Sequence, residues 1–318
     1  MKNGYFKFAY KLLILIVIMF VVDRVCGSIM AHFFEKEPLG DAAAFAHAIE
    51  NPKEDILVYG SSRAMHTYDP RVLEKELGLS CFNCGRNAST IIYHAAIMPS
   101  ALDRQGPLPK AIILDVTPKE LSWRNGEEGN EVLASMILPY VNKNKQFEKM
   151  ANDLFPKELM KAKVSKLYPY NSMILSIIRN YSAKGNDNIA GYVPLFGTKA
   201  SHKPITLKIN TEVDEYAKTK FEFFVKEVTS RRIPLYVIIS PAFVNPFPDT
   251  KSEIATKEIL AKYNVPLWDY SVDTTFRKRK YFYDNVHLNE KGATAFSEFI
   301  AKRIKDSMLK DKEDDLRQ

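Results

Sequence analysis

Short, strongly apolar runs alternate along this chain with stretches of helical periodicity. Such runs, several of them closed by glycine or proline, are typical of strands buried on both faces of a parallel sheet. Five strands are predicted, at 55–60, 80–85, 110–116, 233–241 and 265–270. Because helices separate them, the predicted fold class is α/β, a three-layer α/β/α, flavodoxin-like architecture whose strands end at one shared edge.

Helices are predicted between and after these strands. Asp69 and Pro70 mark one helix start, because proline suits the first helical position. Ser252 supplies a capping signal for another. Further helical stretches are predicted at 90–102, 252–264 and 289–308, the last with its apolar side chains on one face. The final residues, 309–318, are predicted to form a charged, frayed tail.

One long stretch, about 117–212, breaks the alternation of strands and helices. It is rich in lysine, asparagine and tyrosine and contains helical patches such as 171–183. We interpret it as an insertion after the third strand, within a catalytic domain at 55–308, and not as a separate fold. An insertion at the carboxyl edge of the sheet would lie over a site there, as a lid or substrate-binding element.

The N-terminus carries an unbroken apolar run, Leu12–Val22, behind three lysines. By itself the run has the length of a signal-peptide core, shorter than a membrane span of roughly 18–20 residues. Apolar residues at 6–10 lengthen it, since lysine side chains can reach back to lipid headgroups. Basic residues ahead of the run predict a cytoplasmic N-terminus and an extracytoplasmic remainder.

Whether this segment is a cleaved signal or a retained anchor depends on the residues that follow it. The tripeptide at 26–28 makes a poor cleavage site, because Asp23 and Arg24 lie just ahead of it. We therefore predict a retained signal-anchor, a transmembrane helix at 1–30, followed by a juxtamembrane helix at 31–54.

Composition narrows the classes of partner. With 46% hydrophobic and 26% charged residues, the chain has an ordinary globular composition. Its net charge is +7, but no basic stripe is interleaved with aromatic residues, so nucleic acid is not an expected partner. A basic surface suits an anionic membrane or an acidic glycan instead.

Cys81 and Cys84 form a C-x-x-C pair. A metal site would need two further soft ligands at suitable spacing, and a redox role would need a thioredoxin-like unit. Neither is evident, so no metal ion and no cofactor is expected. The pair could oxidise outside the membrane, but the simpler interpretation is two small residues at the end of a buried strand.

Three groups of polar residues fall at the ends of predicted strands. The segment 60–63, Gly-Ser-Ser-Arg, ends the first strand, Gly85 ends the second, and Asp284 and His287 precede the last helix. The carboxyl ends of parallel strands lie at one edge, so these groups are expected to meet there.

Their residue types match nucleophilic catalysis. A serine hydroxyl needs a base to take its proton, and a histidine held by a carboxylate serves as that base. A helix starting directly after Ser62 would offer a backbone N–H to a developing oxyanion. Gly85 would let a second backbone N–H approach, because glycine carries no side chain.

The segments "VYGSSRAMHTYDP", "FNCGRNAST" and "DNVHLNEKGA" resemble blocks I, II and V of the SGNH (GDSL-like) hydrolase superfamily. The resemblance is closer to its membrane-anchored bacterial branch, which includes the D-alanine transfer protein and polysaccharide O-acetyl-modifying proteins. It implies Ser62 as nucleophile, the block II glycine at Gly85, and Asp284 with His287 as the D-x-x-H pair.

The match departs from the family pattern at two blocks. Ser61 stands where block I usually has aspartate. The block III asparagine, which usually completes the oxyanion hole, has no counterpart; Asp115 and Thr117 stand there. Asn83 and Asn87 are candidate substitutes for this donor.

Three residues near the proposed nucleophile are candidates for substrate binding: Arg63, His66 and Asn83. Arg63 could contact an anionic substrate or form a structural salt bridge. His66 lies four residues after Ser62, so it could line the pocket, bind substrate or lie at the surface. Asn87 is assigned to the oxyanion hole together with the Ser62 and Gly85 amides.

These features predict a serine esterase or O-acyltransferase, held in a bacterial cytoplasmic membrane by one span, with its catalytic domain in the periplasm. The resemblance implies a cell-envelope glycan as the acylated substrate or acceptor, and an acyl-exporting membrane protein as a partner. The alternative is a catalytically degraded member of this fold that binds glycan or assists assembly. A metal-dependent phosphodiester hydrolase is not favoured, because no Asp and His cluster is apparent.

Overall fold

The computed structural model describes residues 2–36, 41–50, 52–122, 127–182, 188–207, 212–246 and 249–317. The chain divides into two compact units. The first comprises 1–43 and 130–184, and the second comprises 44–129 and 185–318. The sheet and every residue assigned to the candidate site belong to the second unit.

The second unit is built on one sheet of five parallel strands. These are β1 (Ile56–Tyr59), β2 (Cys81–Asn83), β3 (Ala111–Asp115), β4 (Leu235–Ile239) and β5 (Leu267–Asp269). Their order, β2-β1-β3-β4-β5, is that of flavodoxin-like folds. Each strand lies inside its predicted range, so the α/β class and the strand assignment are confirmed.

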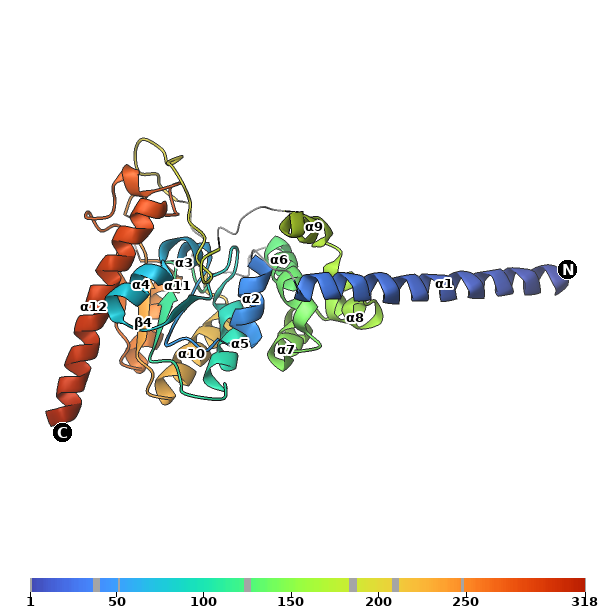
Figure 1. Cartoon of the computed structure of the whole chain (residues 1–318), viewed down its shortest axis with the longest axis horizontal. Coiled ribbons are helices and arrows are strands. Elements are labelled where there is room, and N and C mark those ends of the chain that lie inside the picture. Colours follow the sequence, from blue (N-terminus) through green and yellow to red (C-terminus); the bar gives the residue numbers. More distant parts are fainter. Residues whose placement is uncertain are drawn as a thin grey trace. The chain divides into compact units, whose positions relative to one another are not determined.

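Helices cover both faces of this sheet (Figure 1). The helices of the second unit are α2 (Asp41–Glu50), α3 (Ser62–Thr67), α4 (Pro70–Leu77), α5 (Ile91–Leu102), α10 (Glu215–Ser230), α11 (Lys251–Lys262) and α12 (Glu290–Arg317), with a 3₁₀ turn η3 (Arg279–Tyr281). Alternate strand residues point to opposite faces. Ile56 and Val58 join the core cluster of Phe296 on α12, whereas Tyr59 meets Phe224 on α10 with ring centroids 5.4 Å apart.

Two predicted helix ends differ from the structure. The cap of α11 is Thr250, whose hydroxyl accepts from Glu253 N at 3.0 Å. Ser252 lies inside the first turn, and its hydroxyl accepts from Leu121 N at 2.9 Å. The predicted tail at 309–318 continues α12 through Arg317, and Gln318 lies outside the described residues.

The first unit is helical. Its elements are α1 (Lys2–Glu35), α6 (Glu127–Ile137), whose first residues precede the unit's boundary, η1 (Leu138–Tyr140), α7 (Lys145–Leu154), α8 (Pro156–Val164), η2 (Tyr168–Tyr170) and α9 (Ile174–Ser182). Within the described residues, α1 is the one helix long and apolar enough to cross a membrane, by length and composition.

The structure divides the N-terminal segment differently from the predicted domains. The helix α1 is continuous through Glu35, past the predicted anchor end at 30, and the next helix begins at Asp41. Positions 37–40 and 51 of the predicted juxtamembrane helix lie outside the described residues. Within the predicted insertion, 130–184 is grouped with the N-terminal segment in the first unit, and the rest belongs to the second unit.

Candidate active site

A sharp turn after β1 places the nucleophile candidate. Gly60 has a φ of 145°, and a Cβ there would lie 2.6 Å from the Asp115 carbonyl oxygen, so glycine is required. The Ser61 hydroxyl then caps α3 by accepting from Arg63 N at 3.3 Å. Ser62 is therefore the first residue of α3, with its side chain beyond the carboxyl end of β1.

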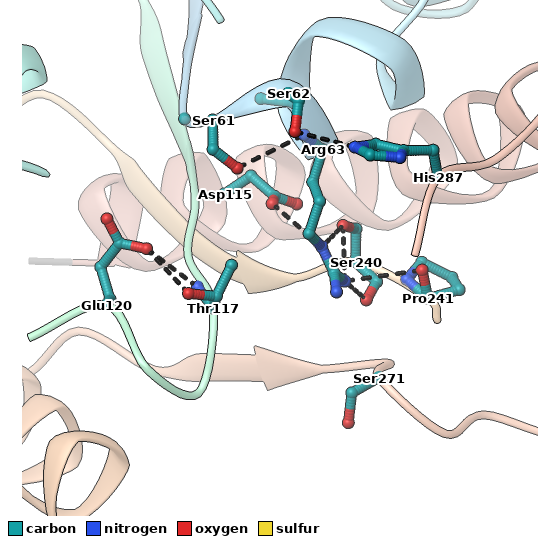
Figure 2. Close-up of polar contacts among 12 residues, drawn as sticks. Ser61, Ser62, Arg63, Asp115, Thr117, Glu120, Ser240, Pro241, Ser271 and His287 are labelled. Atoms are coloured by element: carbon teal, nitrogen blue, oxygen red, sulfur yellow. Dashed lines mark hydrogen bonds and ion pairs between the residues drawn. The ribbon is translucent and has the colours of Figure 1, made fainter. Parts of the chain in front are cut away.

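The structure brings the three predicted triad side chains together. Ser62 Oγ lies 2.8 Å from His287 Nε2, and Figure 2 shows this contact. His287 Nδ1 lies 2.9 Å from Asp284 Oδ2. The carboxylate can only accept, so Nδ1 carries the hydrogen and Nε2 is free to accept from the serine hydroxyl. This is the geometry of a nucleophile, a base and a carboxylate that orients the base.

The Asp284 carboxylate is held in its ionised form. Burial raises the pKa of this carboxyl, but hydrogen bonds from the His287 ring and from the Val286 and His287 backbone N–H groups outweigh burial and lower the pKa to about 2. Both N–H groups donate to Oδ1 at 2.9 Å. His287 Nδ1 lies 3.0 Å from Oδ1 and 2.9 Å from Oδ2, and Oδ2 is the oxygen that accepts neither backbone N–H. The loop thus fixes the direction in which the carboxylate faces.

Gly85 does not supply the oxyanion donor assigned to it. Its N–H donates to Asn83 Oδ1 at 2.9 Å and is not free for a ligand. The glycine is needed for packing instead, because a Cβ would lie 2.6 Å from Met65 N on α3. The close approach predicted for this position is therefore present, but it serves contact between the turn and the nucleophile helix.

The next turn of the same loop offers unused backbone donors. The N–H groups of Asn87 and Ala88 donate to no acceptor among the described residues. Ala88 has a φ of 56°, a left-handed conformation that costs a residue with a Cβ about 1–2 kcal/mol. Strained backbone of this kind clusters at functional sites. The Asn87 and Ala88 N–H groups are therefore candidate oxyanion donors, together with Ser62 N–H.

The strain at Ala88 can be measured. Ala88→Gly is expected to stabilise the protein by roughly 0.5–1 kcal/mol, because glycine adopts this φ freely but loses more chain entropy on folding. In a thermal melt the Tm should rise by about 2 °C. Ala88 is exposed, so no packing is lost. A lower Tm would contradict the assigned strain.

Asn83 is a structural residue and not a substrate-binding one. Its side-chain amide donates to the carbonyls of Ala64 and Tyr68 at 2.8 and 2.9 Å, and its oxygen accepts from Gly85. Every hydrogen-bonding atom except one lone pair is thus used inside the protein. Asn83 ties β2 to both ends of the nucleophile helix.

Arg63 likewise turns away from the site. Figure 2 shows its side chain running from α3 toward Ser240. Its Nε donates to Ser240 Oγ at 3.2 Å, Nη2 donates to the Ser240 carbonyl, and Nε lies 3.9 Å from Asp115 Oδ1. Only 8% of Arg63 is exposed, so these contacts favour the salt-bridge alternative over substrate binding.

His66 packs beside the base. Its ring lies edge-to-face against the His287 ring, with centroids 5.4 Å apart. Its Nδ1 donates to the Val193 carbonyl at 2.7 Å, and its Nε2 lies 3.2 Å from the Asn87 side-chain oxygen. His66 is buried, so of the predicted alternatives it forms a wall of the site and is not a surface residue.

Residues 188–207 form a strap that contacts both His66 and the loop that carries Asp284 and His287. Its Val193 carbonyl meets His66, its Leu195 carbonyl accepts from Glu290 N at 2.8 Å, and Ser201 Oγ accepts from Asn285 Nδ2 at 2.6 Å. The part of the predicted insertion that lies against the site is therefore this strap. Whether it acts as a lid stays a prediction.

Several residues that build the site were not predicted from sequence. Gly191 packs against the Asn83 carbonyl, where a Cβ would lie 1.8 Å away. Asn289 donates to the Gly197 and Lys280 carbonyls at 3.0 and 2.9 Å and caps the start of α12. Asn and Gly in the segment after His287 were a local signal for that cap, but nothing local marked Val193 or Ser240.

The C-x-x-C pair plays no visible part in the site. Cys81 and Cys84 are both free and buried. Burial raises the pKa of both thiols, which keeps them protonated and unreactive. This matches the simpler interpretation of two small residues at a strand end.

No family model matches the chain, and no curated protein matches it. Among solved structures, the chain is similar to AlinE4, which is described as an SGNH-hydrolase family esterase. The two chains share 13% sequence identity, and the TM-score is 0.31. The alignment covers 79% of this chain and 95% of that chain. A mutant of the same esterase gives 14% identity with the same coverage and TM-score. A likeness this low carries no information about chemistry.

Proposed function

We propose that this chain is a membrane-anchored, extracytoplasmic serine esterase or O-acyltransferase. The observation that carries the proposal is the continuous hydrogen-bonded relay from Ser62 through His287 to Asp284. All three side chains stand at the carboxyl edge of a parallel sheet, where ligands of such folds bind. The tight turn at Gly60 and the cap at Ser61 hold the serine in position for this relay.

The chemistry follows from the relay. Ser62 Oγ attacks an ester carbonyl carbon while His287 Nε2 takes the hydroxyl proton, and the carbonyl oxygen becomes an oxyanion facing Ser62 N–H and the turn at 87–88. The alcohol leaves with the proton from His287, which leaves an acyl-enzyme. A water or sugar hydroxyl then gives its proton to His287 and attacks the acyl carbon, which frees Ser62.

The substrate proposal is an acyl ester of a cell-envelope glycan, with acetyl as the simplest acyl group. Tethering by α1 would keep the enzyme beside polymers assembled at the membrane, and the net charge of +7 suits acidic glycans. An acyl-exporting membrane protein would be the donor if the enzyme is a transferase. Appearance of the acyl group on added glycan, and not only as free acid, separates transferase from esterase.

A fluorophosphonate probe tests the nucleophile. The purified full chain is expected to be labelled on Ser62, and Ser62→Ala should abolish labelling, since the probe reacts only with an activated serine. Ser61→Ala is the matched control. It removes a cap worth about 1 kcal/mol but leaves the Ser62 contact with His287, so labelling should persist. Intact-protein mass spectrometry measures both.

The alternative, a degraded site that binds glycan without turnover, makes the opposite prediction. The observation in its favour is that the Gly85 N–H is already engaged by Asn83. Folded protein that resists the probe at high concentration and long exposure would exclude the serine enzyme and support this alternative.

A further inference from the structure

The positive charge of the chain is concentrated in one segment of the first unit. Residues 130–184 contain nine Lys and Arg against four Asp and Glu, a net charge of +5 out of +7 for the whole chain. The residues of the catalytic relay all belong to the second unit. Lys143, Lys149, Lys161 and Lys163 form ion pairs with nearby carboxylates, and the remaining excess of positive charge suits a partner of opposite charge.

The same segment packs against residues 23–27 of α1, which follow the apolar run. The Asp23 carboxylate accepts from Lys166 N at 2.9 Å and from Leu167 N at 3.3 Å, and it also accepts from the Ser165 hydroxyl. Gly27 lets the two backbones touch, since a Cβ there would lie 2.5 Å from the Lys166 carbonyl carbon. Residues 23–27 are thus structural parts of this unit, so α1 belongs to the folded protein.

If α1 spans a membrane, these contacts set the depth of the turn at 164–167 relative to it. On α1, Val25, Ile29 and Phe33 are exposed beyond the charged pair Asp23 and Arg24. Before that pair, the exposed large apolar side chains run from Tyr5 through Val22. At 1.5 Å per residue that stretch is about 27 Å long, close to the ~30 Å hydrocarbon thickness of a bilayer. Asp23 begins the polar end of the span, so the turn that it caps lies within about one helical turn, ~5 Å, of the membrane boundary.

Exposed apolar side chains occur at this level. Met160 and Val164, four residues apart on one face of α8, are 62% and 68% exposed. The Val164 carbonyl accepts from the Arg24 side chain, which places the end of α8 beside the end of the span. Lys157 and Lys161 lie on the same helix, one turn before these apolar positions.

We propose that α8 docks on the outer face of the lipid bilayer that α1 spans. Met160 and Val164 enter the boundary between headgroups and acyl chains, and the lysines of α8 meet anionic lipid phosphates, as in amphipathic interfacial helices. The segment 130–184 is then a collar that rests on the membrane surface. This inference rests on the proposed retained anchor, but it does not depend on the serine chemistry.

Depth-dependent quenching tests the collar. In the full chain with Cys26→Ser, bimane is attached to Val164→Cys or, separately, to Met160→Cys, and the protein is placed in nanodiscs of phosphatidylcholine and phosphatidylglycerol. Both labels should lose at least about half of their fluorescence when the lipid carries a 5-doxyl group. Cys81 and Cys84 are buried and should not react. Unchanged Tm values show that the variants fold.

Two further positions make the outcomes distinct. Ile254→Cys on α11 is an exposed position of the second unit and should stay unquenched. Ile14→Cys lies within the apolar run and should be quenched by 12-doxyl lipid. If the label at position 14 is quenched but the labels at 160 and 164 are as little quenched as the label at 254, the collar is overturned. The exposed face of α8 would then be a site for a protein partner. No quenching at 14 would overturn the anchor and the collar together, whereas fluorophosphonate labelling of the same sample reports the serine site separately.

Discussion

Replacing Asp284 by asparagine is expected to lower the rate of ester turnover by about four orders of magnitude, on the scale seen for serine triads. Oδ1 of Asp284 is held by the Val286 and His287 N–H groups. An asparagine keeps those bonds only if its amide NH₂ replaces Oδ2, which faces His287 Nδ1 at 2.9 Å. The NH₂ group then forces the hydrogen onto Nε2, the tautomer that cannot accept from Ser62.

The measurement is kcat for a chromogenic acetyl ester, with Asp273→Asn as control. Asp273 caps Thr275 N at 2.7 Å outside the relay, so its variant should keep wild-type kcat. An Asp284→Asn enzyme within tenfold of wild type would refute the orienting role. The melting temperature near neutral pH should fall modestly, because the variant lacks the stabilisation that the ionised carboxylate gives, and solvent screening reduces that stabilisation at a part-exposed site.

The pH dependence of stability has a defined sign at Asp284. Its pKa of about 2 lies below the ordinary value of an unfolded aspartate, about 3.9. Its stabilising contribution is therefore complete above about pH 4 and is lost as the pH falls toward 2. In this range the wild type should lose stability faster than Asp284→Asn.

The sheet and the triad were predictable because their signals are local. A buried strand is a short apolar run, and a strand end is marked by the glycine or polar residue that stops it, as at Gly60. Parallel connectivity then brings every strand end to one edge, so Ser62 and His287 meet although 225 positions separate them. D-x-x-H is compact enough for both of its side chains to face each other across one turn.

The supporting contacts were not predictable, because the type of a residue does not indicate which residue distant in sequence it will contact. Arg63 follows the nucleophile and has the residue type that binds anions, yet its guanidinium is used by Ser240, 177 positions away. Gly85 has the right residue type for an oxyanion donor, but the side chain of Asn83 folds back on its N–H. Segment 130–184 forms a compact unit with the N-terminal segment, although it follows β3 in sequence.

Arg63 connects helix α3 to the ends of two strands, β3 and β4. Asp115 is at the end of β3 and Ser240 follows β4, and Arg63 contacts both (Figure 2). The Tyr68 hydroxyl donates to Asp115 Oδ2 at 2.8 Å from the other end of α3. Both ends of this six-residue helix are thus tied to one buried carboxylate at the end of β3.

Arg63→Met should therefore be among the most destabilising substitutions in the second unit, costing about 3–5 kcal/mol, because it leaves a buried carboxylate without its cation. The Tm should fall by about 10 °C or more. Burial raises the pKa of Asp115 even with the guanidinium opposing it. Without Arg63 the carboxyl retains its proton to higher pH, so the stability loss should grow as the pH rises from 5 to 8.

Two variants separate this network from a general loss of packing. Asp115→Asn added to Arg63→Met removes the uncompensated charge while an amide oxygen can still accept from Tyr68, so the double variant should recover at least about half of the lost free energy of unfolding. Arg231→Met removes a guanidinium that pairs with Glu227 at the surface and should cost under about 1 kcal/mol. If the double variant is no more stable than Arg63→Met at pH 8, the buried charge is not what Arg63 compensates, and its methylene packing carries the effect.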